Sequence, residues 1–573
     1  MKKNRNLRLS IVLVLIVIIG AAIIGRLFLL QIKNRKLYEA QALGQQVAFS
    51  KVIGSRGQIF GVSSQETKGG SGSGQVRGFA INKDSWIISA NPENIPDKAV
   101  FAEMLSEAIG QTQEKILLDL DSENSYVVLA KNISSVDLEK IKKLSLKGLS
   151  WQNDPERFYP QGGMASHTLG FLGGEGSGQY GLEGYYDDIL AGKSGIQQER
   201  AGLDSIFSNF DRISLDGSDI YLTIDYNIQF QAETLLEQEK IKNDIDSGQI
   251  IVLKPDSGRI IALADFPNFD PNRYSKERDL EIFQNSAVQK LFEPGSIMKP
   301  FTMAAAMNEG KVSPDTVYTD TGVVNFGTKQ IHNFADEIYG KQTMTQVLEK
   351  SINTGAVFAE QQIGKDSFLD YINKFGFTSK TGVDIQGEVS SRNDNIKSGI
   401  EMNLATASFG QGIELTPMQI ARGFCALANG GRLIKPYIVE KIINGGDETY
   451  TRPEFSELIL SQQTVSQINA MLVNVIEKGF NGAAKIQGYY MAGKTGTAQV
   501  PLKKGKGYET NKTIQSFAGY GPAFNPQFVI LIKLDNPKVS VSALSAVPIF
   551  KQLAQFIVNY WKIPPDYDIN VAQ

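Results

Sequence analysis

The stretch Ile11–Leu30, "IVLVLIVIIGAAIIGRLFLL", constrains this chain most, because its twenty residues carry one charge, Arg26. As an α-helix it would be about 30 Å long, which matches the hydrocarbon core of a bilayer, and Arg26 can reach the interface. The run therefore predicts one transmembrane helix over residues 9–31. A cleaved signal peptide is the alternative, but its apolar core would be shorter, and the nearest small-x-small site, Ala40-Gln41-Ala42, follows a charged stretch.

The orientation of this helix rests on the basic residues that flank it. Four precede the span and three follow it: Lys2, Lys3, Arg5 and Arg8, then Lys33, Arg35 and Lys36. This small excess favours a cytoplasmic tail over residues 1–8, with the rest of the chain outside the cytoplasmic membrane.

Charge and rare residues exclude several classes of function. The formal net charge is −3, so no basic field favours nucleic acid, and we expect no nucleic-acid partner. Cys425 is the only cysteine and lies in an apolar helical run, which predicts a buried side chain. The only histidines are His167 and His332, too few for a zinc site or a histidine relay. We expect no metal and no cofactor.

The chain is long enough for several domains, and its patterns predict a multidomain α/β (α+β) protein. In residues 32–215, strand-like runs such as "QVAFSKVI" alternate with helical patterns such as "DKAVFAEMLSEAIG" and with a glycine-rich loop, "GGEGSGQYG". This region reads as an irregular α+β module.

Residues 216–565 read as a second domain. A hairpin, "GQIIVLKPDSGRIIALADFP", lies near its start, three strand patterns, "YYMAGKTGTAQV", "QSFAGYGPA" and "PQFVILIKLDNP", lie near its end, and the middle is largely helical. We predict a central antiparallel sheet formed by the two ends of the domain and flanked by helices. Residues 566–573 form a C-terminal tail.

A serine and a lysine lie three residues apart in "FEPGSIMKPFTMAAAM". If Ser296 opens a helix, Ser296 and Lys299 share one face, and the helix N-terminus adds positive potential beside the hydroxyl. Pro300 disfavours helical geometry at Lys299. This pair alone is frequent by chance.

Two further motifs follow in order along the chain. "SINTG" supplies Ser351 and Asn353 at the end of a helical pattern. "GKTGTAQ" supplies Lys494, Thr495, Gly496 and Thr497 on a predicted strand. The three motifs in this order are the mark of penicillin-binding proteins and class A β-lactamases.

The sequence resembles the class B penicillin-binding proteins, which are monofunctional peptidoglycan D,D-transpeptidases. The resemblance covers nearly the whole chain and includes "RFYPQGGMASHTLGFLG", "GLEGYYDDILAGKSG" and "ATASFGQGIELTPMQIARGFCALANGG". It implies that residues 32–215 are a pedestal similar to a dimerisation module. It also implies that residues 216–565 are an extracytoplasmic transpeptidase domain of the serine β-lactamase-like fold, anchored in the cell membrane.

The resemblance also implies the partners. These are peptidoglycan stem peptides, with a D-Ala-D-Ala donor and an amine acceptor, and β-lactams, which act as covalent inhibitors and make such enzymes antibiotic targets. The third expected partner is a polytopic membrane glycan polymerase. The resemblance leaves open whether the enzyme serves side-wall growth or septation. The compact first module favours a division-type enzyme.

Ser296 would attack a peptide carbonyl and form an acyl-enzyme, but an alcohol needs a base, and Lys299 can serve only when neutral. At a reference pKa of about 10.4, a neutral amine at pH 7 costs about 4.6 kcal/mol. Desolvation and the second cation, Lys494, would both lower that cost. Ser351 would relay a proton, and whether it or Lys299 is the immediate base stays open.

The resemblance assigns the remaining site residues. The backbone N–H groups of Ser296 and Thr497 would form the oxyanion hole, and Asn353 would hold the donor's amide. Lys494, Thr495 and Thr497 suit the terminal carboxylate of the stem peptide, and Gly496 would leave room for an extended donor beside the strand. Ile352 stands where many relatives have a polar residue.

Two other functions compete with transpeptidation. In a D,D-carboxypeptidase or β-lactamase-type hydrolase, water would replace the acceptor amine; the anchor and the long first module oppose it. In a catalytically silent scaffold that activates a glycan polymerase, the chemistry would be lost; the intact motifs oppose it. Arg157 and Gly181-Leu182-Glu183 match family positions in the first module, where we expect packing or interdomain contact rather than catalysis.

Overall fold

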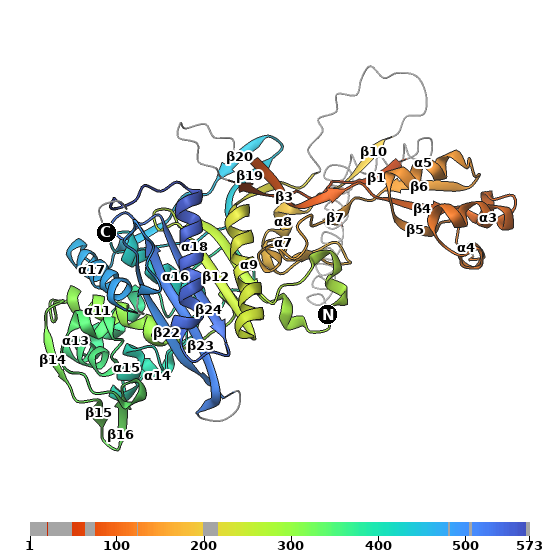
Figure 1. Cartoon of the computed structure of the whole chain (residues 1–573). Coiled ribbons are helices and arrows are strands. Elements are labelled where there is room, and N and C mark those ends of the chain that lie inside the picture. The colour runs from red at the N-terminus through yellow and green to blue at the C-terminus, as the bar shows by residue number, and fades with distance from the viewer. Residues whose placement is uncertain are drawn as a thin grey trace, which may run out of the picture. The chain divides into compact units, whose positions relative to one another are not determined.

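The computed structural model describes residue 20 and residues 49–63, 75–122, 124–198, 216–479, 482–502 and 507–568. The chain divides into two compact units. The first is Met1–Ser55 with Gly192–Gly217, and its described part contains the antiparallel pair β1 (Phe49–Ile53) and β10 (Ser194–Gln198). The second is Arg56–Ala191 with Ser218–Gln573, coloured from orange to blue in Figure 1.

The predicted transmembrane helix at residues 9–31 lies outside the described residues, apart from Gly20. Within the described part of the chain, no helix combines the length and the apolar character that a membrane span needs.

A small α+β layer lies in the first third of the second unit. Its sheet has the order β5-β4-β6, and its helices bury a core of their own. The strands are β4 (Trp86–Ala90), β5 (Val127–Ile133) and β6 (Leu149–Asn153), and the helices are α3 (Lys98–Ile109), α4 (Gln113–Leu120) and α5 (Ser135–Lys143). Asp97, Thr112 and Ser134 cap the helices, as such residues do when they precede an apolar periodic run. The helix predicted from "DKAVFAEMLSEAIG" is confirmed.

A six-stranded mixed sheet contains strands from both predicted domains, in the order β20-β19-β11-β2-β3-β7. They are β2 (Ile59–Ser63), β3 (Gln75–Lys83), β7 (Glu156–Phe158), β11 (Asp219–Asp225), β19 (Val439–Asn444) and β20 (Asp447–Tyr450). β11 pairs parallel with β2 and antiparallel with β19. The boundary at residues 215 and 216 stays a prediction, but this sheet continues across it.

Shorter helices, strands and 3₁₀ turns lie between these elements along the chain. They are α6 (Ser166–Leu169), β8 (Phe171–Leu172), β9 (Gly178–Gln179), α7 (Gly181–Tyr185), α8 (Asp187–Leu190), and then η2 (Pro92–Asn94), η3 (Pro271–Lys276), η4 (Leu280–Phe283) and α10 (Ser286–Gln289). β8 and β9 form a hairpin around the glycine-rich loop.

The central sheet of the second domain is five-stranded and antiparallel, in the order β13-β12-β24-β23-β22. Its strands are β12 (Ser247–Leu253), β13 (Ile260–Phe266), β22 (Ala492–Pro501), β23 (Tyr508–Gly521) and β24 (Phe528–Asp535). The predicted hairpin is β12–β13, and the three predicted late strands complete the sheet. The prediction of one sheet formed by the two ends of the domain is confirmed.

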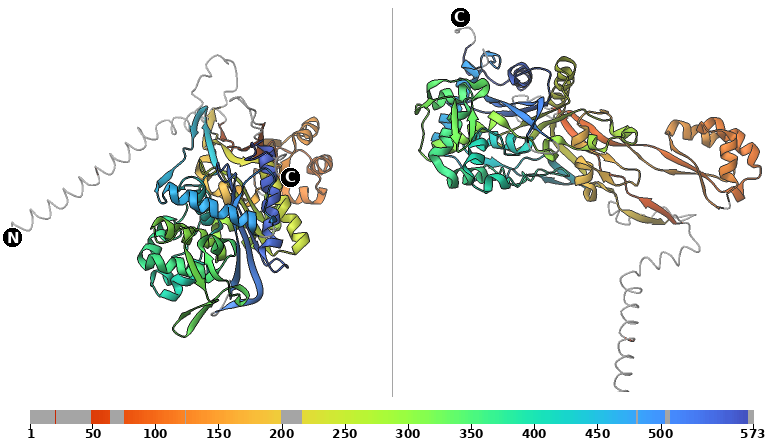
Figure 2. Two further views of the ribbon diagram at one scale, coloured as in Figure 1. Left: turned by 60° about the vertical axis from the view of Figure 1, so that its left-hand side comes forward. Right: turned by 90° about the horizontal axis from the view of Figure 1, so that it is seen from below.

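Both faces of this sheet are covered, because alternate residues of each strand point to opposite sides. Ile250 and Val252 join the core with α9 (Tyr226–Asn243) and α18 (Ala546–Tyr560), whereas Ile251 and Leu253 join the core with α16 (Pro417–Ala428). Figure 1 shows α9 and α18 over one face, and the same yellow-green and dark-blue helices lie beside each other in Figure 2.

The middle of the domain is helical, as predicted, but it also contains three two-stranded sheets. The helices are α11 (Lys299–Asn308), α12 (Met344–Glu349), α13 (Asn353–Lys374), α14 (Asp394–Lys397), α15 (Glu401–Ser408), α16 and α17 (Gln462–Lys478). The strand pairs are β14 (Val317–Asp320) with β17 (Gly340–Thr343), β15 (Val323–Phe326) with β16 (Lys329–His332), and β18 (Arg432–Ile434) with β21 (Phe455–Leu458). Further short 3₁₀ turns are η5 (Gly295–Met298), η6 (Phe334–Asp336) and η8 (Ser542–Leu544).

Candidate active site

Ser296 lies in the 3₁₀ turn η5, and α11 begins only at Lys299. The sequence had placed the helix start at Ser296. Because the helix starts later, Pro300 falls in its first turn, where a missing backbone N–H costs no intrahelical hydrogen bond. Lys299 is helical despite the proline that follows it, with φ −56° and ψ −38°.

The turn that carries Ser296 packs against strand β22. Gly295 has φ +60°, and a Cβ atom there would lie 2.8 Å from the carbonyl oxygen of Thr497. A Cβ atom on Gly496 would lie 2.7 Å from the carbonyl oxygen of Pro294 and would also collide with Ser516 Oγ. Gly496 was expected to leave room for a substrate backbone. The structure adds a second reason for glycine, because the protein's own backbone fills the space at its Cβ position.

The two lysines of the motifs are buried and share one hydroxyl group. Lys299 is 1 % exposed, and its Nζ donates to the carbonyl oxygen of Ser351 at 2.5 Å, to Ser351 Oγ at 3.2 Å and to Asn353 Oδ1 at 2.8 Å. Lys494 is fully buried, and its Nζ donates to Ser351 Oγ at 3.0 Å. It also lies 3.3 Å from both oxygens of Thr495. The fold therefore brings residues of all three motifs together.

Burial lowers the pKa of both amines. The pKa of Lys299 lies well below its ordinary value, because burial disfavours the ammonium form and the positive charge of Lys494 adds to that effect. Burial alone lowers the pKa of Lys494 to about 7. Burial and the charge of Lys494 are the two causes that were expected from the sequence to lower the pKa of Lys299.

Ser351 has a left-handed backbone with φ +59°, which is rare for a residue other than glycine. It lies between the end of α12 and the start of α13, next to the buried side chain of Ile352. Such a conformation costs on the order of 1–3 kcal/mol and persists only where neighbouring contacts hold it.

A buried polar network behind Ser351 supplies such contacts. Asn333 Oδ1 accepts hydrogen bonds from the backbone N–H groups of Asn353 and Thr354, both at 3.1 Å. Asn333 Nδ2 donates to both carboxylate oxygens of Asp320, at 3.1 and 3.0 Å, and Thr354 Oγ1 donates to Asp320 Oδ1 at 2.6 Å. The three side chains of this network, Asp320, Asn333 and Thr354, belong to residues at most 4 % exposed.

The hydrogen bonds of this network stabilise the ionised form of Asp320. Burial by itself would raise the pKa of Asp320, but hydrogen bonds from Thr354, Tyr339, Gly322 and Asn333 hold that pKa below its usual value. Sequence reasoning missed Asp320 and Asn333, because each reads as an ordinary polar residue beside a turn. Only the pairing of β14 with β17 and of β15 with β16 places them behind the second motif.

Like Lys494 and Thr495, two more predicted substrate-binding side chains have partners within the protein. Asn353 accepts from Lys299, and its Nδ2 donates to the carbonyl oxygen of His332 at 3.0 Å. Thr497 Oγ1 lies 2.9 Å from Ser542 Oγ. Their roles toward a substrate amide and carboxylate stay predictions.

His332 meets this cluster through its backbone carbonyl oxygen, whereas its side chain and those of His167 and Cys425 have other surroundings. His167 is buried, which lowers its pKa to about 4, and its Nε2 is 2.8 Å from the carbonyl oxygen of Ile282. The side chain of His332 faces solvent, with Nδ1 3.0 Å from Asp336. Cys425 is fully buried, as predicted. Within the described ranges, no group of three or more histidine, cysteine or acidic side chains is arranged to hold a metal ion.

Two family models match the chain. The penicillin-binding protein transpeptidase domain matches residues 248–555, more than half of the chain, and the penicillin-binding protein dimerisation domain matches residues 72–222. The chain belongs to the class B penicillin-binding proteins.

Relatives of this penicillin-binding protein extend over nearly its full length. Stage V sporulation protein D of Bacillus subtilis is 32 % identical, over 81 % of this chain and 73 % of the relative. The probable peptidoglycan D,D-transpeptidase PenA of Neisseria meningitidis is 27 % identical, over 99 % of this chain and 95 % of the relative. Penicillin-binding protein 3 of Mycobacterium tuberculosis, solved in complex with aztreonam, has a TM-score of 0.69 and 25 % identity, over 91 % of this chain and 99 % of that chain.

These findings identify the activity of this penicillin-binding protein. It is a peptidoglycan D,D-transpeptidase, and the multidomain fold combines the pedestal module with the transpeptidase domain. The hydrolase and scaffold alternatives are set aside.

Proposed function

We propose that Ser296 is the nucleophile of this transpeptidase and that Lys299 is its general base. The observation that carries the proposal is the pair of buried amines that share Ser351 Oγ, at 3.2 Å from Lys299 and 3.0 Å from Lys494. Two ammonium groups held so close disfavour each other, so the site favours loss of one proton. Lys299 lies one helical turn from Ser296, and both burial and the charge of Lys494 lower its pKa, whereas burial alone lowers the pKa of Lys494.

In the first half-reaction, neutral Lys299 takes the proton of Ser296 Oγ as that oxygen attacks the carbonyl carbon of the penultimate D-alanine. The negative charge that forms on the carbonyl oxygen is held by the backbone N–H groups of Ser296 and Thr497. The proton passes from Lys299 through Ser351 Oγ to the leaving amine, and terminal D-alanine departs. An ester on Ser296 remains.

In the second half-reaction, the acceptor amine attacks this ester. Its proton passes through Ser351 and Lys299 to Ser296 Oγ, which leaves as the crosslinking amide forms. Ser351 suits a relay because a hydroxyl can accept from both amines and still donate its own proton.

The donor peptide is proposed to lie along β22. This strand forms one edge of the five-stranded sheet among the described residues, and an exposed edge can pair with an extended peptide. Lys494, Thr495 and Thr497 would bind the terminal carboxylate, Gly496 would keep the strand close to Ser296, and Asn353 would bind the donor amide.

Residues 9–31 are proposed to anchor the enzyme in the cell membrane, with its domains outside the cytoplasm. A polytopic glycan polymerase is the proposed membrane partner. Both proposals are supported by the apolar run Ile11–Leu30 and by the family resemblance.

Peptide mapping of the penicillin adduct tests the assignment of the nucleophile. Tryptic cleavage at Lys290 and Lys311, without cleavage before Pro300, gives a peptide that spans residues 291–311 and contains Ser296. We expect the penicilloyl mass on this peptide, with fragment ions that place it on Ser296. An adduct on any other peptide would refute the assignment.

The pH dependence of acylation should be bell-shaped. As pH rises through the lowered pKa of Lys299, that amine loses its proton and the rate of acylation increases. As pH rises beyond the pKa of Lys494, about 7, that amine loses its charge, carboxylate binding weakens and the rate falls. Each limb should change about tenfold per pH unit. The measurement is the second-order rate constant of acylation by a fluorescent penicillin from about pH 5 to about pH 9.5.

Lys494→Arg is the matched variant for this profile. Arginine keeps its charge throughout this range, so the falling limb should disappear while the rising limb remains. If wild type and variant fall alike at high pH, Lys494 does not set that limb.

A further inference from the structure

We propose that this enzyme has a second ligand site, a pocket that binds an N-acetylated sugar of the glycan strand. The pocket has a volume of about 490 Å³ and lies between the β8–β9 hairpin and residues 274–283. It contains no residue of the three catalytic motifs. The inference goes beyond the proposed chemistry at Ser296, because it concerns the sugar chain rather than the stem peptide.

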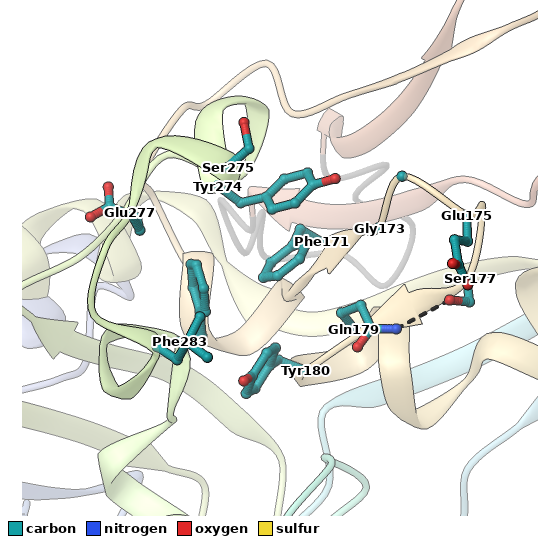
Figure 3. Close-up of a pocket in the computed structure, with 12 residues that line it drawn as sticks. Phe171, Gly173, Glu175, Ser177, Gln179, Tyr180, Tyr274, Ser275, Glu277 and Phe283 are labelled. Carbon is teal, nitrogen blue, oxygen red and sulfur yellow. Dashed lines mark hydrogen bonds between the residues drawn. The ribbon is translucent and has the colours of Figure 1, made fainter.

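One wall of the pocket is aromatic (Figure 3). The rings of Phe171 and Tyr274 are stacked, with centroids 4.2 Å apart and an interplanar angle of 12°, and Phe283 meets Phe171 edge-on at 4.9 Å. Phe171 and Phe283 are buried, whereas Tyr274 and Tyr180 are half-buried. The two tyrosines are therefore the part of this wall that a ligand can touch. The electron-rich face of an aromatic ring attracts the polarised C–H groups on the apolar face of a sugar.

The opposite side of the pocket is polar. It is formed by the glycine-rich loop from Gly173 to Ser177 and by Gln179, whose Nε2 donates to Ser177 Oγ at 3.1 Å. A hydroxyl and a carboxamide can exchange hydrogen bonds with ring hydroxyls and with an acetamido group. Aromatic rings on one side and a few neutral polar groups on the other are typical of a small-molecule site.

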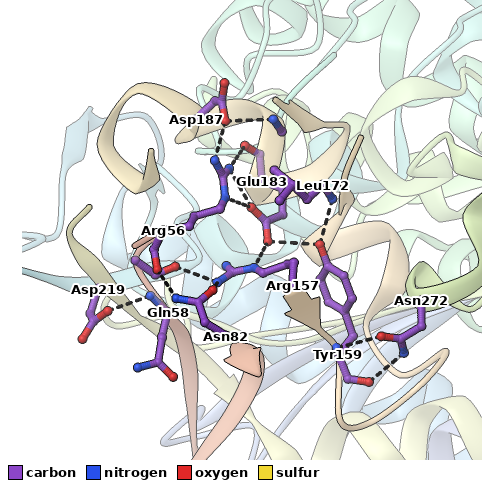
Figure 4. A network of polar contacts seen from close by, with 12 residues as sticks. Arg56, Gln58, Asn82, Arg157, Tyr159, Leu172, Glu183, Asp187, Asp219 and Asn272 are labelled. Atoms are coloured by element: carbon purple, nitrogen blue, oxygen red, sulfur yellow. Dashed lines mark hydrogen bonds and ion pairs between the residues drawn. The ribbon is translucent and has the colours of Figure 1, made fainter. Parts of the chain in front are cut away.

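One residue, Tyr159, joins the two segments that carry the stacked rings, η3 with Tyr274 and β8 with Phe171 (Figure 4). Its backbone exchanges two hydrogen bonds with the side chain of Asn272, at 3.0 and 2.9 Å, and Asn272 lies in η3 with Tyr274. Its hydroxyl accepts from the backbone N–H of Leu172, next to Phe171, at 2.9 Å and donates to Glu183 at 3.1 Å.

A buried ion-pair network fixes Tyr159 and the hairpin in turn (Figure 4). Glu183 is fully buried between Arg56 and Arg157, with N–O distances of 2.7 Å to each. Asp187 Oδ1 pairs with Arg56 at 2.7 Å and accepts from the backbone N–H of Gly178 in β9 at 2.8 Å. Arg157 and Glu183 are thus buried and paired with each other, and their expected role in packing or interdomain contact stays a prediction. A pocket held in this way loses little conformational entropy when a ligand binds.

A second contact suits an enzyme whose substrate is a polymer. A strand held at this pocket would raise the effective concentration of its stem peptides near the enzyme. A cationic peptide is the competing ligand, because Glu175 and Glu277 also line the pocket. The neutral sugar is favoured because the stacked rings of Phe171 and Tyr274 and the neutral polar groups of Ser177 and Gln179 suit its apolar face and its hydroxyls.

The test uses the full-length protein in detergent, first acylated with penicillin so that the catalytic site is blocked. The probe is tetra-N-acetylchitotetraose, and binding is measured by isothermal titration calorimetry. We expect wild type to bind, and Tyr274→Ala to raise the Kd by about tenfold or more. Gln179→Ala, at an exposed position, should raise it about threefold. Tyr126→Ala, at a tyrosine 54 % exposed and outside the pocket, is the matched control and should leave the Kd unchanged.

Three results would overturn the proposal. They are no binding of the probe to wild type, equal binding by wild type and both pocket variants, and preferential binding of a lysine-rich peptide that Tyr274→Ala abolishes. The rate of penicillin acylation should stay at the wild-type value in every variant, which separates this site from the proposed chemistry at Ser296. Should Tyr274→Ala fail to fold, Gln179→Ala decides the question, because its side chain is at the surface.

Discussion

Replacing Lys299 by methionine should lower the rate constant of penicillin acylation by about 10²–10⁴-fold, the range for loss of a general base. Methionine fills nearly the same buried volume, so the helix start and the packing around residue 299 should persist. What disappears is the amine that lies 3.2 Å from Ser351 Oγ and 2.8 Å from Asn353 Oδ1. The measurement is stopped-flow acylation with a fluorescent penicillin, with thermal unfolding to verify the fold.

Lys299→Arg separates proton transfer from electrostatics. Arginine keeps a positive charge but does not release its proton, so it should be as inactive as methionine if Lys299 is the base. Lys290→Met, at an exposed lysine shortly before the same turn, is the matched control and should acylate normally. If Lys299→Arg acylates within about tenfold of wild type, the lysine acts through its charge, and Ser351 becomes the candidate base.

Asn333→Asp should lower the acylation rate by about 100-fold, although Asn333 is only 4 % exposed and lies behind Ser351. The change replaces an amide that donates to both oxygens of Asp320 with a second carboxylate, so two like charges meet in a buried site. The start of α13 should then shift and move Ser351 away from the two amines. A displacement of about 1 Å in a catalytic group can cost about 100-fold in rate. Acylation kinetics and the melting temperature measure the effect.

The double variant Asp320→Asn/Asn333→Asp tests whether the network acts through this pairing. In this variant the amide of residue 320 faces the carboxylate of residue 333, so one donor again meets one acceptor. The carboxylate of residue 333 still accepts from the N–H groups of residues 353 and 354. We expect the double variant to recover at least about tenfold of the lost rate, because residues in direct contact couple strongly. Asn325→Asp, at an exposed asparagine of the same hairpin, is the matched control and should have no effect. Without recovery in the double variant, Asn333 does not act through Asp320.

Local patterns predicted the central sheet well. The β12–β13 hairpin follows from two β-branched runs around a Pro-Asp-Ser-Gly turn, and β22, β23 and β24 follow from apolar runs bounded by turn residues. The start of α11 was placed three residues too early, because a 3₁₀ turn and the first turn of an α-helix have nearly the same sequence preferences.

The same local patterns did not predict which distant strands pair with each other. Nothing in the residues of β11 or β19 indicates that they share a sheet with β2 and β3, since a strand's own pattern does not name its partner. The roles of Asp320 and Asn333 were hidden for the same reason.

The sequence by itself determined the three motifs and the order in which they occur, and from them the catalytic groups are predicted. A serine, two lysines, a second serine and an asparagine in three ordered motifs are a chemical set that can be read without coordinates. The tertiary structure alone decided that Lys299 and Lys494 are both buried against the same Ser351 hydroxyl, which lowers the pKa of both amines. The physical reason is that a pKa depends on desolvation and on charges within a few ångströms, and both are set by segments that lie far apart in the chain.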